Sequence, residues 1–275
     1  MKRRDVMAVG MLALAPLAAC RRAPDTSEAM SPDVDLKTEL ARVARARVLF
    51  AHQSVGRNIL DGVARLAAAA GVTLNVSELR AGPIPDGAGL YHVNIGENGQ
   101  PEGKLAAFSA LLVGGTQPAP DVAALKFCYV DLEDSDGARA TRLAEAYLAG
   151  TRALQSARPG LRLLHMTMPL RSETPGVKTR LARLIGRDRY GDADHAARAV
   201  YNAHLRQHLA GQPLLDIAQL ESTRADGTRT SFSRAGVEVP TLAPEYTTDG
   251  GHLNATGQRR VAAAWLRSVA ALLPR

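Results

Sequence analysis

Aromatic residues and cysteines are scarce in this chain of 275 residues. Phe, Trp and Tyr together make up 4% of it, whereas apolar residues of all kinds make up 46%. We therefore expect an aliphatic core, which suits a helix-covered sheet better than an aromatic-rich β-sandwich. Two cysteines, Cys20 and Cys128, are too few for a disulfide framework or a cysteine metal cluster. Cys128 lies in an apolar stretch and is expected to be a small buried hydrophobe.

The sequence also lacks a phosphate-cradling glycine loop, so no nucleotide cofactor is expected. The formal net charge of +7 is modest for this length and is spread along the chain. It makes no case for nucleic-acid binding, although it would favour contact with anionic lipid.

The first residues have the pattern of an export signal. Basic residues at positions 2–4 precede an apolar run at 6–19, which is shorter than the roughly 20 residues that span a bilayer. We interpret residues 1–19 as a signal peptide. Adjacent Arg3 and Arg4 also permit twin-arginine export.

The apolar run ends in Leu-Ala-Ala-Cys, and this ending resembles the lipobox of bacterial lipoproteins. The resemblance implies that Cys20 is lipidated, carries acyl chains such as palmitate and becomes the mature N-terminus. The protein would then be anchored in the bacterial cell envelope, facing the periplasm or the cell exterior. The alternative is an ordinary secretory peptide with an incidental cysteine.

The remaining sequence predicts one α/β domain behind a linker. Residues 20–36 are rich in Pro, Ser, Asp and Ala and are expected to form a flexible tether, with the domain at 37–275. Strands are expected at 47–51, 72–79, 122–130, 161–168 and 213–217, and helices at 56–70, 104–112, 138–156, 192–209 and 255–273. This alternation predicts a three-layer α/β/α fold with a central, mainly parallel, flavodoxin-like sheet.

Two segments far apart in the sequence carry residues suited to nucleophilic catalysis. Ser54 follows the first predicted strand and precedes a helix, so its backbone N–H lies where the helix dipole favours an oxyanion. The alternative is a serine that only caps the helix. Asp249 and His252 lie three residues apart on a Gly-Gly turn before the last helix, where a carboxylate can orient an imidazole. The alternative there is a polar turn.

With these residues in this order, the chain resembles the SGNH, or GDSL, hydrolase superfamily. The closing block Asp-Gly-Gly-His-Leu-Asn-x-x-Gly carries the resemblance, which covers about residues 45–273. It implies that Ser54 is the nucleophile, His252 the general base and Asp249 the group that orients it.

The chain departs from that superfamily at two places. His-Gln-Ser-Val replaces Gly-Asp-Ser-Leu around the serine, and Asp131 rather than an asparagine follows the third predicted strand. An ionised aspartate cannot donate a hydrogen bond to an oxyanion. The resemblance implies oxyanion donors from Ser54 and Gly96, with Asn98 or Asn94 in place of the missing asparagine.

These residues predict an extracytoplasmic serine esterase or deacylase that needs no cofactor. The resemblance and the expected compartment together imply acyl esters as substrates, including O-acetylated glycans of the cell envelope, and acyl transfer to a sugar would use the same residues. The alternative is a catalytically silent SGNH-like domain that binds glycan or an envelope partner.

Other polar residues give weaker signals. His52 is a rival base because it lies close to Ser54, and His165 is expected to be a core histidine. His204 and His208 have a spacing that can grip a metal, but no carboxylate follows in zincin fashion, so no metal is expected. Basic residues after the fourth predicted strand form either a solvated face or a lid over an acidic or glycan substrate: Arg171, Lys178, Arg180, Arg183, Arg187 and Arg189.

Overall fold

A computed structural model describes residues 34–80, 83–114, 119–173, 181, 185 and 191–274 of the chain. The expected signal peptide, Cys20 and most of the expected tether lie outside the described residues. Of the basic residues proposed as a lid, Arg171 is described and the other five are not. No helix among the described residues is long and apolar enough to cross a membrane.

Six parallel strands form the central sheet, in the order β2-β3-β1-β4-β5-β6. They are β1 (Arg47–His52), β2 (Val76–Glu78), β3 (Gly89–Asn94), β4 (Val122–Leu125), β5 (Arg162–Met166) and β6 (Leu214–Leu215). Apart from the short edge strand β2, this is the flavodoxin-like order 2-1-3-4-5. The structure thus confirms the predicted parallel α/β sheet.

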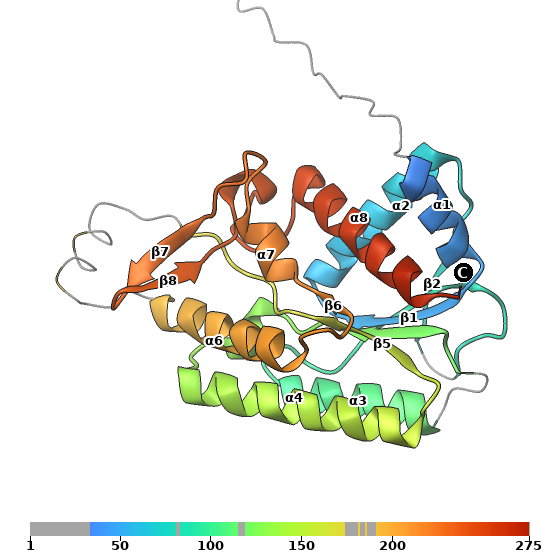
Figure 1. The fold of residues 1–275 in the computed structure, drawn as a ribbon, viewed down its shortest axis with the longest axis horizontal. Coiled ribbons are helices and arrows are strands. Elements are labelled where there is room, and N and C mark those ends of the chain that lie inside the picture. Colours follow the sequence, from blue (N-terminus) through green and yellow to red (C-terminus); the bar gives the residue numbers. More distant parts are fainter. Residues whose placement is uncertain are drawn as a thin grey trace, which may run out of the picture. The chain divides into compact units, whose positions relative to one another are not determined.

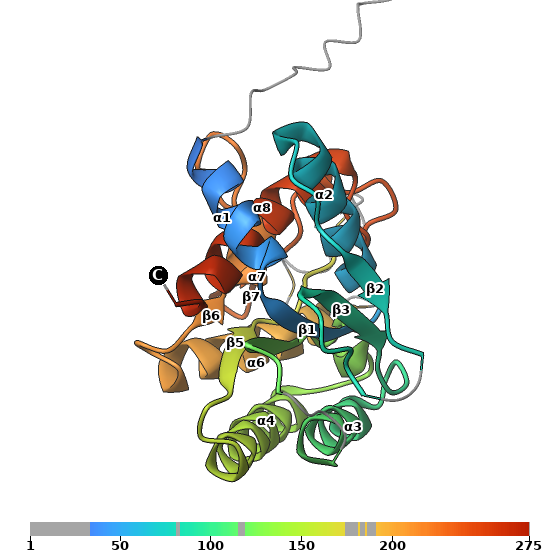
Figure 2. The same cartoon turned by 90° about the vertical axis from the view of Figure 1, so that its right-hand side faces the viewer.

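Helices cover both faces of this sheet, giving three layers (Figures 1 and 2). One layer contains α1 (Val34–Ala44), α2 (Val55–Ala70), α7 (Ile217–Ser222) and α8 (Ala255–Leu272), and the other contains α3 (Pro101–Gly114), α4 (Gly137–Ala157) and α6 (Asp192–His208). Along β1, Val48 and Phe50 pack into the first layer, whereas Leu49 and Ala51 pack into the second. All six residues of β1 are buried, as expected for a central parallel strand.

Several elements differ from the sequence prediction. Strand β3 was not expected, because the polar residues His92 and Asn94 interrupt its apolar run. Hydrogen bonding to β1 on one side and β2 on the other stabilises the strand despite these residues. The strand expected at 72–79 is reduced to β2, and the one at 213–217 to β6 followed by α7. An unpredicted antiparallel hairpin, β7 (Ser231–Arg234) and β8 (Val237–Pro240), lies beside α6.

Two boundaries also need correction. The strand expected at 122–130 ends at Leu125, and the chain then enters the 3₁₀ turn η1 (Tyr129–Leu132) because the Asp131 carboxylate binds the backbone N–H of Cys128. Val34–Leu36, expected in the tether, belong to α1, whose residue Leu40 is buried in the core. Cys128 is buried and free, as expected.

Helices α2 and α8 pack closely against each other, and Gly62 makes this possible. A Cβ atom at Gly62 would lie 2.5 Å from the backbone oxygen of Gln258 and 2.7 Å from Cβ of Ala262. Trp265, further along α8, is fully buried against Phe50 of β1, with ring centroids 5.4 Å apart. The two helices are therefore held at a fixed separation on the sheet.

We expect Gly62→Ala to lower the free energy of unfolding by about 1–3 kcal/mol, because the added methyl group overpacks a rigid helix–helix contact. This range is the net effect, and it already allows for alanine's better helix propensity, which is worth about 1 kcal/mol. Gly103→Ala in α3 is the matched control, since the atom nearest to its Cβ lies 3.9 Å away. Urea unfolding measures both variants; equal stability of the two would contradict the packing argument.

Candidate active site

Ser54 lies in a strained turn between β1 and α2. Its backbone has φ 48° and ψ −106°, a conformation that costs a non-glycine residue about 1–3 kcal/mol. Although Ser54 occupies the N-cap position of α2, its side chain makes no capping hydrogen bond. The hydroxyl instead lies 2.6 Å from Nε2 of His252. The structure therefore does not support the capping role.

His252 lies in the loop that leads into α8, and Asp249 sets its orientation. Nδ1 of His252 is 2.7 Å from Oδ2 of Asp249. A carboxylate only accepts hydrogen bonds, so the shared proton is on Nδ1 and Nε2 is left as an acceptor. The Ser54 hydroxyl can then donate to Nε2, which is the arrangement of a nucleophile with its base.

The Asp249 carboxylate is held in its charged form. Its Oδ1 accepts the backbone N–H groups of Gly251, at 2.9 Å, and of His252, at 2.7 Å. These bonds and the one from the His252 ring lower the pKa of Asp249 well below its ordinary value. The carboxylate is thus ionised at any physiological pH and can stabilise a protonated His252.

The loop itself is fixed from three sides. Gly250 adopts φ 84°, a left-handed conformation that favours glycine, and its carbonyl accepts the backbone N–H of Ser172 at 2.8 Å. Asn58 of α2 accepts the backbone N–H of Leu253 at 3.0 Å. The Tyr129 and His252 rings meet edge to face with centroids 6.1 Å apart, and the Arg171 guanidinium lies over the Tyr129 ring, 5.6 Å from its centroid.

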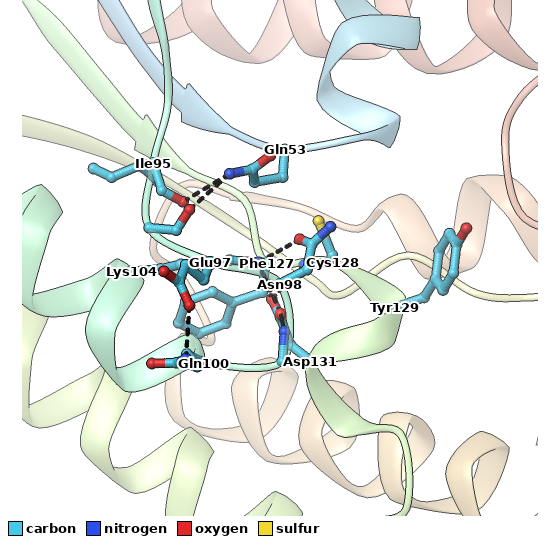
Figure 3. Close-up of polar contacts among 12 residues, drawn as sticks. Gln53, Ile95, Glu97, Asn98, Gln100, Lys104, Phe127, Cys128, Tyr129 and Asp131 are labelled. Atoms are coloured by element: carbon cyan, nitrogen blue, oxygen red, sulfur yellow. Dashed lines mark hydrogen bonds and ion pairs between the residues drawn. The ribbon is translucent and has the colours of Figure 1, made fainter.

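Backbone donors are available beside the serine. The N–H groups of Ser54 and Gly96 make no hydrogen bond with the described part of the chain. Gln53, which stands where the SGNH superfamily has aspartate, holds the two segments together (Figure 3). Its Nε2 donates to the carbonyl oxygens of Gly96, at 2.8 Å, and Ile95, at 3.3 Å. The substituted residue therefore joins the serine turn to the loop after β3.

Asn94 and Asn98 were both expected as replacements for the missing oxyanion asparagine, and the structure gives them different surroundings. Nδ2 of Asn94 donates to Oε1 of Glu78 at 2.9 Å, so Asn94 is engaged at the edge of the sheet. Asn98 lies in the loop that Gln53 holds against the serine turn. Asp131 is not a donor: it forms a buried ion pair with Lys104.

The other histidines that the sequence singled out make contacts away from Ser54 in the described part of the chain. His52 is fully buried, its Nε2 lies 3.2 Å from Nδ1 of His92, and burial lowers its pKa to about 2, so it is not the base. His165 meets the hydroxyl of Tyr147 at 3.0 Å in the core, as expected. His204 and His208 stack with ring centroids 4.1 Å apart. Within the described ranges, no group of three or more His, Cys, Asp or Glu residues could hold a metal.

Sequence reasoning missed Asn58, Tyr129 and Lys104 as parts of this region. Asn58 lies in the first turn of the helix predicted at 56–70, directly after Ser54, so its nearness to the serine could have been expected from the sequence. Tyr129 and Lys104 gave no such signal, because their positions depend on how the strands pair.

We expect Asn58→Leu to slow the reaction of Ser54 with a fluorophosphonate by about tenfold, which corresponds to about 1.4 kcal/mol. The reason is that Leu253 loses the acceptor of its N–H, a loss worth about 1 kcal/mol, and the His252 loop is released. Asn58→Asp keeps the acceptor and is the matched control. A folded Asn58→Leu protein that reacts at the wild-type rate would show that this bond does not position His252.

Comparisons with known proteins return distant structural likenesses alone: no family model and no curated protein matches the chain. The similar solved structures include three provisionally named proteins. One is a platelet activating factor from Streptococcus pneumonia, with 14% identity over 84% of this chain and 91% of that one and a TM-score of 0.45. A GDSL-like lipase from Parabacteroides merdae has 11% identity over 83% of this chain and 97% of that one, with a TM-score of 0.45. A lipase from Chitinophaga pinensis has 12% identity over 80% of this chain and 95% of that one, with a TM-score of 0.40. Its own strand order, with the serine after β1 and Asp-x-x-His before α8, gives this chain a divergent SGNH/GDSL-like fold.

Proposed function

We propose that the protein is a serine hydrolase that cleaves acyl esters. One observation carries the proposal: the continuous set of contacts from the Ser54 hydroxyl through His252 to Asp249, at 2.6 and 2.7 Å. A capping serine and a polar turn would not need this alignment, and the strain at Ser54 keeps its side chain out of the capping position.

The chemistry follows from these contacts. His252 Nε2 takes the hydroxyl proton while Oγ of Ser54 attacks the ester carbonyl carbon, and Asp249 stabilises the imidazolium that forms. The backbone N–H groups of Ser54 and Gly96 face the developing oxyanion. The intermediate collapses, His252 passes its proton to the departing alcohol, and Ser54 is left acylated. Water, deprotonated by His252, then releases the carboxylic acid and restores the serine.

We propose acyl groups on large carriers, such as O-acetylated glycans, as the substrates. The side chains of His252 and Asp249 are 46% and 53% exposed, so the reacting groups lie at an open surface rather than in a closed tunnel. An open site can accept a small acyl group on a bulky polymer. The two neighbours named as a lipase and a GDSL-like lipase agree with an acyl-ester substrate.

We place this activity in the bacterial cell envelope. The lipobox-like ending at Cys20 supports a lipid anchor, and the polar stretch after it supports a tether that carries the domain away from the membrane. Acylated envelope polysaccharides would be within reach of such a domain.

The test is ester turnover by the full chain in detergent solution, with p-nitrophenyl acetate as reporter and acetate release from acetylated xylan as the polymer assay. We expect Ser54→Ala and His252→Ala to lower kcat by at least about 10³-fold, and Asp249→Asn by about 10³–10⁴-fold because the wrong tautomer is favoured.

Ser77→Ala and His208→Ala are matched controls, because both residues lie outside the site, and they should keep the wild-type rate. Ester hydrolysis by the Ser54→Ala protein at the wild-type rate would contradict the serine mechanism. A folded wild type that hydrolyses neither ester would favour the binding-domain alternative.

A further inference from the structure

Lys104, Asp131 and Asn98 form a polar cluster where the carboxyl ends of β1, β3 and β4 meet (Figure 3). Nζ of Lys104 lies 2.7 and 2.8 Å from the two carboxylate oxygens of Asp131, and both side chains are wholly buried. Nζ also donates to Oδ1 of Asn98 at 2.9 Å. The ammonium therefore has an acceptor for each of its protons, which is the condition for burying such a charge.

Asp131 is itself fixed from two segments of the chain. Its oxygens accept the backbone N–H of Gly99, at 2.9 Å, in the loop after β3 and that of Cys128, at 2.7 Å, after β4. With four hydrogen bonds the carboxylate cannot turn, so the ammonium of Lys104 is held at one point.

This fixed ammonium determines which way the Asn98 carboxamide faces. A lysine ammonium has only donors, so the atom of Asn98 that meets it is the oxygen. Nδ2 must then point away from Lys104, and it makes no hydrogen bond within the described part of the chain. The Asn98 loop lies against the serine turn through the bond from Gln53 to Gly96. The two N–H donors of the Asn98 carboxamide are thus left without a partner in the described part of the chain, in the loop that Gln53 bonds to the serine turn.

We propose that Lys104, held by Asp131, is a positioning residue that fixes Asn98 with Nδ2 toward the oxyanion formed at Ser54. This rests on the proposed serine chemistry and deepens it, because the aspartate that replaces the superfamily's asparagine would supply the donor indirectly. A carboxamide oriented before the reaction needs no reorganisation when the oxyanion forms. The positive charge at its oxygen also polarises its N–H bonds.

The test is a double-mutant cycle on the full chain, with the rate of Ser54 modification by a fluorophosphonate and kcat for p-nitrophenyl acetate as readouts. Asn98→Ala removes the donor and should lower both rates by about 10²–10³-fold, as for the loss of one oxyanion donor. The neutral pair Lys104→Met with Asp131→Leu leaves no unpaired buried charge and adds no new hydrogen-bond donor at position 131. We expect it to lower both rates at least tenfold with KM unchanged.

The coupling between the two changes is the decisive result. Combined with Asn98→Ala, the neutral pair should cost less than a further twofold, because Lys104 then has nothing to position. A full additional loss in the Asn98→Ala background, or wild-type rates in the folded neutral-pair protein, would overturn the proposal. Gln100→Ala is the control that should leave both rates unchanged, because within the described residues the Gln100 side chain is bonded to Glu97 alone.

The outcomes also separate this inference from the proposed function. If Ser54 reacts and turns over ester but the changes are additive, the serine chemistry stands and the positioning role fails. If wild-type Ser54 does not react at all, the proposed function fails first and the positioning role fails with it. Should the neutral pair not fold, Lys104→Gln, which keeps a donor toward Asp131, takes its place in the cycle with the same expected coupling.

Discussion

Close packing of α2 against α8 is the constraint on which the candidate site depends. Ser54 precedes the first residue of α2, and His252 lies three residues before the start of α8. The two residues are 198 positions apart in the sequence, and their side chains meet only if the helix starts lie together. Gly62 permits the close approach of the helices, and Asn58 bonds the His252 loop directly to α2. The site is thus set by helix packing on a shared sheet.

The second feature is that the polar groups are arranged before any substrate binds. Strain at Ser54 directs its hydroxyl away from the cap, and two backbone N–H groups hold Asp249 ionised. Dipoles oriented in advance cost nothing to reorganise during reaction, which is the main source of electrostatic catalysis. In the proposed role of Lys104, its buried ion pair with Asp131 orients a side-chain donor, the Asn98 carboxamide, in the same way.

The three α/β/α layers and the meeting of Ser54 with Asp249 and His252 could be predicted from the sequence, because both follow from local signals. Apolar runs alternating with amphipathic helices gave the parallel sheet, and Ser54 and the Asp249–His252 spacing stand next to predicted element ends. That these three side chains are in contact is observed; their catalytic role stays a prediction. Strand β3 was missed because polar residues break its apolar run, and only its two neighbours stabilise it. Lys104 was missed because its segment Pro-Glu-Gly-Lys has the composition of an exposed helix start, whereas tertiary packing buries it.

The central claim is that Ser54 is an activated nucleophile, and identifying the residue that a fluorophosphonate modifies tests this most directly. The full chain would be treated with the reagent, and its intact mass and proteolytic peptides measured by mass spectrometry. The account predicts one adduct per chain, located on Ser54 within the peptide that follows β1. A folded protein that acquires no adduct, or an adduct on another residue such as Ser172 or Tyr129, would contradict it.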